Sequence, residues 1–188
     1  TGIPQKLVIL RADDAAGEDL DVAPPGFAEQ ADAFFEVVFA VHRRLAAAVP
    51  TLRHLAIQGP NYRQALDPLP GMTVVAVEPD IIDLLAISDL AIAEGGYNTV
   101  NEVRVTRTPA VFLPSRRTVD DQEERVRALE ARGLARVLSG LTSHEIAGQV
   151  EALCTSATAL ADMRRRYAED RMVLGNRAAA EKIVELCG

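Results

Sequence analysis

A chain of 188 residues is long enough for one domain with a substantial core, and two full domains would be a tight fit. Hydrophobic residues make up 48% and charged residues 25%, which is typical of a soluble globular protein and excludes a wholly disordered or fibrous one. The net charge of -7, with 20 lysines and arginines, leaves no basic excess for binding phosphate backbones, so no nucleic-acid partner is predicted.

Short runs of aliphatic and β-branched residues recur along the chain, separated by segments with helical periodicity. This alternation predicts an α/β fold, a Rossmann-like parallel sheet with helices on both faces. The runs lack strict in-out alternation, as expected for strands buried on both sides. The predicted strands are 6–10, 52–57, 72–77, 90–93, 110–113 and 135–138.

Two helical regions are defined by their end signals. The first helix is predicted from about Phe27 to Val49, ending before Pro50. After the last strand, Ser143 is the predicted N-cap of a helix with Glu145 in its first turn, and a helical C-terminal tail follows. The apolar stripe of the first helix, predicted to be core, is Phe34, Phe35, Val38, Val41 and Leu45.

The ends and apolar runs of the chain bear on its location and completeness. No apolar run approaches the roughly 20 residues of a membrane span, and residues 1–6 lack the apolar core of a signal peptide. We therefore expect no membrane span and a cytoplasmic location. The chain begins almost directly on a predicted strand without an initiator Met, which indicates a fragment or a processed or truncated chain.

The segment richest in chemical information begins where the fourth predicted strand ends. Gly95 and Gly96 follow that strand directly and allow a tight turn and a close approach of a ligand to the backbone. Asn98 or Thr99 can then cap a helix whose free N–H groups face the turn. Such a helix N-terminus favours phosphate, and in a doubly wound sheet it lies at the carboxyl edge where ligands bind.

Local physics leaves a second interpretation of this segment open. Gly95 and Gly96 could simply end a strand, and Asn98 could simply cap a helix, as in many α/β proteins. A dinucleotide fingerprint is disfavoured because the Gly-x-Gly-x-x-Gly spacing is absent and the motif follows a late strand. A P-loop is excluded because no Gly-Lys-Ser/Thr follows.

Several spaced motifs resemble the donor site of UDP-glycosyltransferases with the two-domain GT-B architecture. These are Gly-Gly-Tyr-Asn-Thr at 95–99, Glu102, the strand ending in proline at 108–114, and Asp-Asp-Gln at 120–122. Their order is similar to that of the lipid II N-acetylglucosaminyltransferase group and of predicted bacterial glycosyltransferases with a Gly-Gly-Tyr-Asn-Thr motif. The resemblance is strongest from about 74 to 138, and it implies one half of a GT-B fold.

The resemblance assigns the nucleotide to residues around the double glycine. It places the donor diphosphate against Gly95, Gly96, Asn98 and Thr99, in agreement with the anion-binding helix start. It also implies that Glu102 accepts hydrogen bonds from both ribose hydroxyls, which a carboxylate can do. The alternative role of Glu102 is a carboxylate near the helix N-terminus that favours the helix dipole.

The remaining site residues come from other loops. The resemblance implies that Asp121 and Gln122 reach the sugar hydroxyls and that the main chain at Glu78 contacts the uracil edge. Arg11 follows the first strand where relatives carry a Gly-rich, Ser-containing loop, and it could supply a cation there. Glu94 departs from the pattern, because a carboxylate beside a diphosphate is repulsive unless it is neutralised or turned away.

We therefore expect residues 1–188 to form the donor-binding domain of a glycosyltransferase (a transferase of the hexosyl type), without the N-terminal domain that holds the acceptor. The catalytic base usually comes from that other half, so no catalytic residue is predicted and the domain alone is expected to be inactive. No metal or other cofactor is predicted. A nucleotide-sugar hydrolase and a non-catalytic nucleotide-sugar-binding module remain alternatives, and the motifs leave the donor sugar open.

Overall fold

The computed structural model describes residues 7–11, 27–59, 62, 64–115, 122–170 and 175–187, with the side chains of 7–11, 27–30 and 175–179 excepted. Strands and helices alternate through most of this length. The strands are β1 (Leu7–Arg11), β2 (Arg53–Ile57), β3 (Met72–Val75), β4 (Leu90–Ala93), β5 (Ala110–Phe112) and β6 (Ala135–Val137). The helices are α1 (Phe27–Ala48), α2 (Ile81–Ile87), α3 (Tyr97–Thr106), α4 (Gln122–Ala131), α5 (Ser143–Thr155), α6 (Ala159–Glu169) and α7 (Gly175–Cys187).

The six strands form one sheet in the order β3-β2-β1-β4-β5-β6, and every neighbouring pair is parallel. This is the strand order of doubly wound nucleotide-binding folds, in which the order of successive strands across the sheet reverses between β1 and β4. Because all strands run the same way, their carboxyl ends share one edge of the sheet. One row of paired residues crosses that edge: Val75, Ile57, Arg11, Ala93, Phe112 and Val137.

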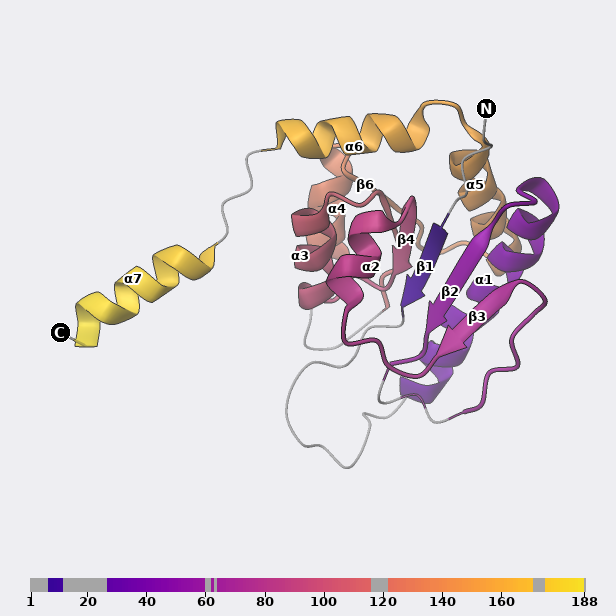
Figure 1. Ribbon diagram of the computed structural model, residues 1–188, viewed down its shortest axis with the longest axis horizontal. Helices are drawn as coiled ribbons and strands as arrows, with labels where there is room; N and C mark the ends of the chain where they lie inside the picture. Colours follow the sequence, from indigo (N-terminus) through magenta and orange to yellow (C-terminus); the bar gives the residue numbers. More distant parts are fainter. Residues whose placement is uncertain are drawn as a thin grey trace.

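Helices cover both faces of the sheet, as the alternating pattern predicted (Figure 1). Leu90 and Ile92 of β4 join the cluster formed with α1 and α5. Ala91 and Ala93 of the same strand join the cluster formed with α2, α3 and α4. Successive residues of a strand point to opposite faces, so an all-apolar β4 supplies both cores at once.

The first helix and its core stripe are confirmed. Helix α1 spans Phe27–Ala48 and ends just before Pro50, within one residue of the predicted end. The helix after β6 begins one residue away from the prediction, because its N-cap is Thr142 instead of Ser143. Thr142 and Glu145 are three residues apart, which allows the reciprocal capping box that Ser143 cannot form with Glu145. The stripe residues Phe34, Phe35, Val38, Val41 and Leu45 are all buried.

The C-terminal part of the described chain is helical, as predicted. Helix α6 crosses one end of the molecule and buries Met163 and Tyr167, whereas α7 is drawn apart from the rest (Figure 1). The apolar side chains Ile183, Val184 and Leu186 of α7 are exposed. Within the described ranges, no helix has the length and apolar character needed to cross a membrane.

Two histidines that are 12 residues apart in sequence meet in the core. The Nδ1 atoms of His42 on α1 and His54 on β2 are 2.7 Å apart, and both side chains are buried. His42 Nε2 lies 3.1 Å from the carbonyl oxygen of Pro70 and must donate to it, so a neutral His42 accepts at Nδ1 from His54. His54 Nε2 is then a bare acceptor, with no hydrogen-bond partner among the described residues. Burial and the neighbouring His42 lower the pKa of His54 from 6.5 to about 3.

This histidine pair predicts a loss of stability in acid. The unfolded chain binds a proton at His54 below about pH 6.5, whereas the folded chain does not until about pH 3. The contribution of neutral His54 is therefore complete above pH 6.5 and declines as the pH falls toward 3. By pH 5 the free energy of unfolding should be lower than at pH 8 by about 2 kcal/mol from this group alone.

Urea unfolding between pH 5 and pH 8 measures this dependence. His54→Leu should flatten the profile, whereas replacing the exposed His144 by Leu should leave its slope unchanged. An unaltered slope in the His54 variant would contradict the assignment.

Candidate functional site

The double glycine lies at the carboxyl end of β4, beside β1 and therefore at the topological switch point. Ala93, the last residue of β4, is paired with Arg11, the last residue of β1. Gly95 has φ +107, a conformation that L side chains rarely adopt, and Gly96 is the N-cap of α3. The helix thus begins immediately after the two glycines, where ligands of doubly wound folds bind.

The predicted capping of α3 by Asn98 or Thr99 is wrong. Both residues lie inside the helix, which begins at Tyr97, and Gly96 has no side chain with which to cap it. Because the two glycines allow a tight turn, α3 begins directly after them at Tyr97, before either predicted cap residue. The N–H groups of the first turn have no carbonyl partner within the helix, so the positive end of the helix dipole faces the turn.

Residues of α3 that were assigned to the nucleotide differ in exposure. Asn98 is exposed and Glu102 is half-buried, and the two lie four residues apart on one side of the helix. Thr99 is buried, with 3% of its surface exposed, so any contact with a ligand would come from its main chain. Asn98 and Glu102 thus share one side of α3, whereas the side chain of Thr99 is buried.

Helix α4 packs directly against the glycine turn. A Cβ atom on Gly95 would lie 2.6 Å from Cγ1 of Val126, much closer than side chains approach in proteins. The neighbouring Arg125 donates from Nη1 to the Gly95 carbonyl oxygen at 3.1 Å. Its guanidinium carbon lies 5.7 Å from the centre of the Tyr97 ring. Sequence reasoning missed Arg125, although its place three residues after Gln122 puts both on one side of α4.

Gln122 is the first residue of α4, and its side chain is buried. It is 1% exposed, and its Oε1 accepts hydrogen bonds from the Ser115 backbone N–H at 3.3 Å and from the Ser115 hydroxyl at 3.2 Å. Ser115 was not identified from the sequence, because nothing in the local pattern predicts its contact with a residue seven positions away. Asp121 lies outside the described residues.

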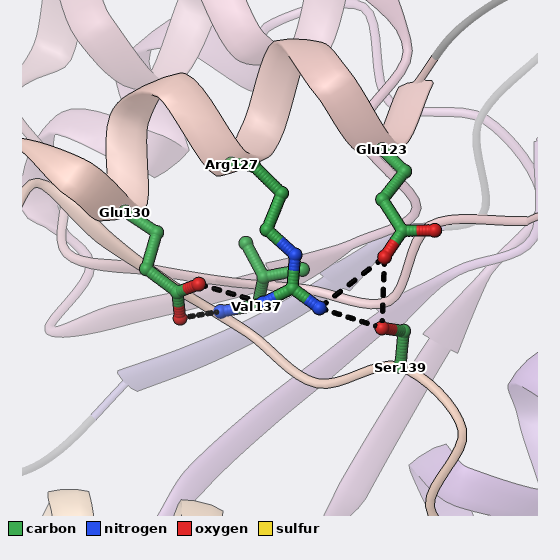
Figure 2. Close-up of polar contacts among 5 residues, drawn as sticks. All are labelled: Glu123, Arg127, Glu130, Val137 and Ser139. Carbon is green, nitrogen blue, oxygen red and sulfur yellow. Dashed lines mark hydrogen bonds and ion pairs between the residues drawn. The ribbon is translucent and has the colours of Figure 1, made fainter.

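The opposite side of α4 is fixed to the loop after β6. Arg127 donates to Glu123 at 3.2 Å, to Glu130 at 2.7 Å and to the Ser139 hydroxyl at 2.8 Å (Figure 2). Glu130 also accepts the Val137 backbone N–H at 2.8 Å, which ties the helix to β6. The contact between Glu130 and Val137 ties α4 to β6, whereas the inner side of the helix meets the glycine turn.

Glu78 and Arg11 also lie toward the carboxyl edge. Glu78 follows β3 by three residues, and its Oε1 accepts the Asp80 backbone N–H at 2.9 Å just before α2 begins. Strands β3 and β4 are three strand spacings apart, or about 14 Å, a separation that an extended nucleotide spans. Arg11 ends β1 beside β4, and its side chain lies outside the described part of the structure.

Glu94 is buried, with 4% of its surface exposed, and the residue is not without an interaction partner. It therefore does not present an exposed negative charge at the turn. Whether this carboxylate is compatible with a diphosphate depends on its direction and on its neutralisation, so the repulsion expected of Glu94 stays a prediction.

Two other kinds of site come into consideration, a groove elsewhere on the surface and a metal centre. A groove of about 480 Å³ opens at the amino ends of β2 and β3, lined by 50–55, Gly71 and Thr73, on the edge opposite the double glycine. In the described part of the chain, no three His, Cys, Asp or Glu side chains are grouped to hold a metal ion.

The fold and the turn define a class: an open doubly wound α/β domain with a helix N-terminus at its switch point. The chain belongs to the glycosyltransferase family 28 C-terminal domain family, whose pattern matches residues 28–182. The predicted half of a GT-B fold is confirmed by the solved structures that the chain resembles.

A glycosyltransferase of known name is similar to the chain in sequence. Over 125 residues the chain is 35% identical to the UDP-N-acetylglucosamine–N-acetylmuramyl-(pentapeptide) pyrophosphoryl-undecaprenol N-acetylglucosamine transferase of Symbiobacterium thermophilum. That match covers 62% of this chain and 33% of the relative, so the chain spans about a third of the relative's length.

Two solved structures share the fold at lower sequence identity. Acinetobacter baumannii MurG is 17% identical with a TM-score of 0.64, covering 97% of this chain and 52% of that one. The spinosyn rhamnosyltransferase SpnG complexed with thymidine diphosphate is 19% identical with a TM-score of 0.61, covering 87% and 42%.

The close approach of Val126 predicts that Gly95→Ala destabilises the protein. The change adds backbone strain at φ +107 and a clash with Val126, together roughly 2–4 kcal/mol of unfolding free energy. Gly140→Ala is the matched control, because Gly140 also has a positive φ, +71, but open space around its Cβ position. Chemical denaturation should show the larger loss at Gly95, and adding Val126→Ala should recover part of it. Equal losses at the two glycines would show that the approach of α4 is unimportant.

Proposed function

We propose that this domain binds the nucleotide part of a UDP-sugar at the carboxyl edge of its sheet, for transfer of the sugar by the complete protein. The observation that carries the proposal is the start of α3 directly after Gly95 and Gly96, without a side-chain hydrogen bond at its N-cap, at the switch point between β1 and β4. Family membership and the name of the Symbiobacterium relative, a UDP-N-acetylglucosamine transferase, support it.

The diphosphate would lie against the first turn of α3. Backbone N–H groups and the helix dipole favour a negatively charged group there, without a metal ion. Asn98 is exposed at this position and can donate a hydrogen bond, whereas buried Thr99 would contribute its backbone. Charge that grows on the diphosphate as it leaves the sugar would be stabilised by the same groups.

The nucleoside would extend from α3 toward β3. Glu102 lies on the same side of α3 as Asn98 and would accept hydrogen bonds from the ribose hydroxyls. The main chain at Glu78 would meet the uracil edge, about three strand spacings away. Arg11, at the end of β1, would lie between these two ends.

The sugar would lie near the start of α4, against Asp121 and Gln122. Since the Gln122 amide oxygen is bound to Ser115, a sugar contact through this oxygen requires one hydrogen bond to be exchanged for another. An N-terminal domain would hold the acceptor and close over the donor, which excludes water and orients the reacting groups.

The first test is UDP binding by the 188-residue chain, measured by calorimetry, with Glu102→Ala. Loss of hydrogen bonds to a charged carboxylate should weaken UDP by roughly 1.5–3 kcal/mol. Glu169→Ala removes a carboxylate from the exposed end of α6 and should bind UDP like the parent chain. Preference of the parent chain for NAD or ATP over UDP would contradict the proposal, and unchanged binding by the Glu102 variant would contradict the ribose contact.

The second test separates the sugar from the nucleotide. Gln122→Ala should leave the affinity for UDP nearly unchanged while weakening UDP-N-acetylglucosamine and UDP-glucose about tenfold, the effect of losing one good hydrogen bond. Ser115→Ala removes the hydroxyl that donates to Gln122 Oε1 but keeps the Ser115 backbone N–H, and it should not weaken the UDP-sugars. Equal losses of UDP and UDP-sugar in the Gln122 variant would rule out a sugar contact.

A further inference from the structure

The Gly95 carbonyl lies outside the hydrogen-bond ladder of α3. The ladder begins one residue later, where Val100 donates to the Gly96 oxygen at 3.0 Å. Arg125 reaches across from α4 and donates to the Gly95 oxygen at 3.1 Å. A side chain from a different helix thus satisfies the last acceptor before α3 starts.

Holding this one carbonyl has a geometric consequence for the whole turn. The peptide group between Gly95 and Gly96 is planar and trans, so fixing the direction of its C=O also fixes the direction of the Gly96 N–H, which points the opposite way. Two successive glycines have the widest choice of backbone angles of any dipeptide. Without an external contact, the turn could therefore present the first N–H groups of α3 in several directions.

Arg125 is itself held in place. Its guanidinium stacks over Tyr97, the first residue of α3, whose ring is 66% exposed. Its neighbour Val126 fills the space that a Gly95 side chain would occupy. Arg127, on the outer side of α4, binds Glu123, Glu130 and Ser139 instead (Figure 2).

We propose that Arg125 is a positioning residue for the diphosphate. It holds the Gly95 carbonyl and so orients the turn, and it does not itself contact phosphate. The identity of the ligand in this inference rests on the proposed function, whereas the effect of Arg125 on the turn is independent of it. Arg125 sets the direction of the α3 N-terminus, and its guanidinium lies over the ring of Tyr97 at the start of that helix.

Binding of UDP and of uridine to single variants tests this role. Arg125→Met should weaken UDP about tenfold, as loss of one well-placed hydrogen bond implies, while uridine, which does not use the turn, is bound as before. Arg127→Met is the matched control on the same helix and should bind both ligands like the parent chain. Arg125→Gln keeps a donor without the charge and should recover most of the UDP affinity.

The contrary outcomes are distinct. Full UDP affinity in Arg125→Met, or equal loss of uridine, overturns the proposal. Recovery by Arg125→Lys but not by Gln, with an effect that disappears in high salt, would show direct charge pairing with phosphate and also overturns it.

Hydrogen exchange separates this proposal from the proposed function. In the chain without nucleotide, Arg125→Met should accelerate amide exchange in residues 97–100, whereas Arg127→Met should not. If the parent chain does not bind UDP, the proposed function fails, and exchange still decides whether Arg125 holds the turn. Unchanged exchange in the Arg125 variant overturns the positioning role whatever the ligand.

Discussion

The turn after β4 depends on a close approach between Gly95 and α4 that leaves no room for a side chain. Val126 occupies the space beside the glycine, and Arg125 takes the adjoining carbonyl. The turn is therefore shaped by a helix that begins 27 residues later in the chain. If Arg125 positions the turn as proposed, the start of α3 and the candidate anion site take their direction from this contact.

The parallel sheet brings the other parts of the site to the same edge. Because all six strands share one direction, the segments that follow β1, β3, β4 and β5 emerge on one side of the sheet. Arg11 and Ala93 are paired across the switch point, so the end of β1 lies beside the glycine turn. A nucleotide bound along this edge, as proposed, would need few residues from any one element, and the core beneath would stay apolar.

Much of the fold followed from periodicity and end signals. The β-branched runs marked all six strands, and the stripe ending at Leu45 together with Pro50 marked the first helix. Errors came at helix starts, where neighbouring residues can all serve as caps. Thr142 is favoured over Ser143 as N-cap by its spacing to Glu145. Gly96 is the N-cap of α3 in place of Asn98, because two glycines allow the chain to turn directly before Tyr97.

The sequence alone determined the order of strand, double glycine and helix, since these depend on local backbone preferences and on the spacing of apolar residues. The tertiary structure decided which distant side chains meet. His42 and His54 share a buried hydrogen bond, and Gln122 is held by Ser115, although nothing in their spacing indicates either contact. Such pairings arise from the stacking of helices on a sheet, because residues far apart in the chain become neighbours only once the strands are paired.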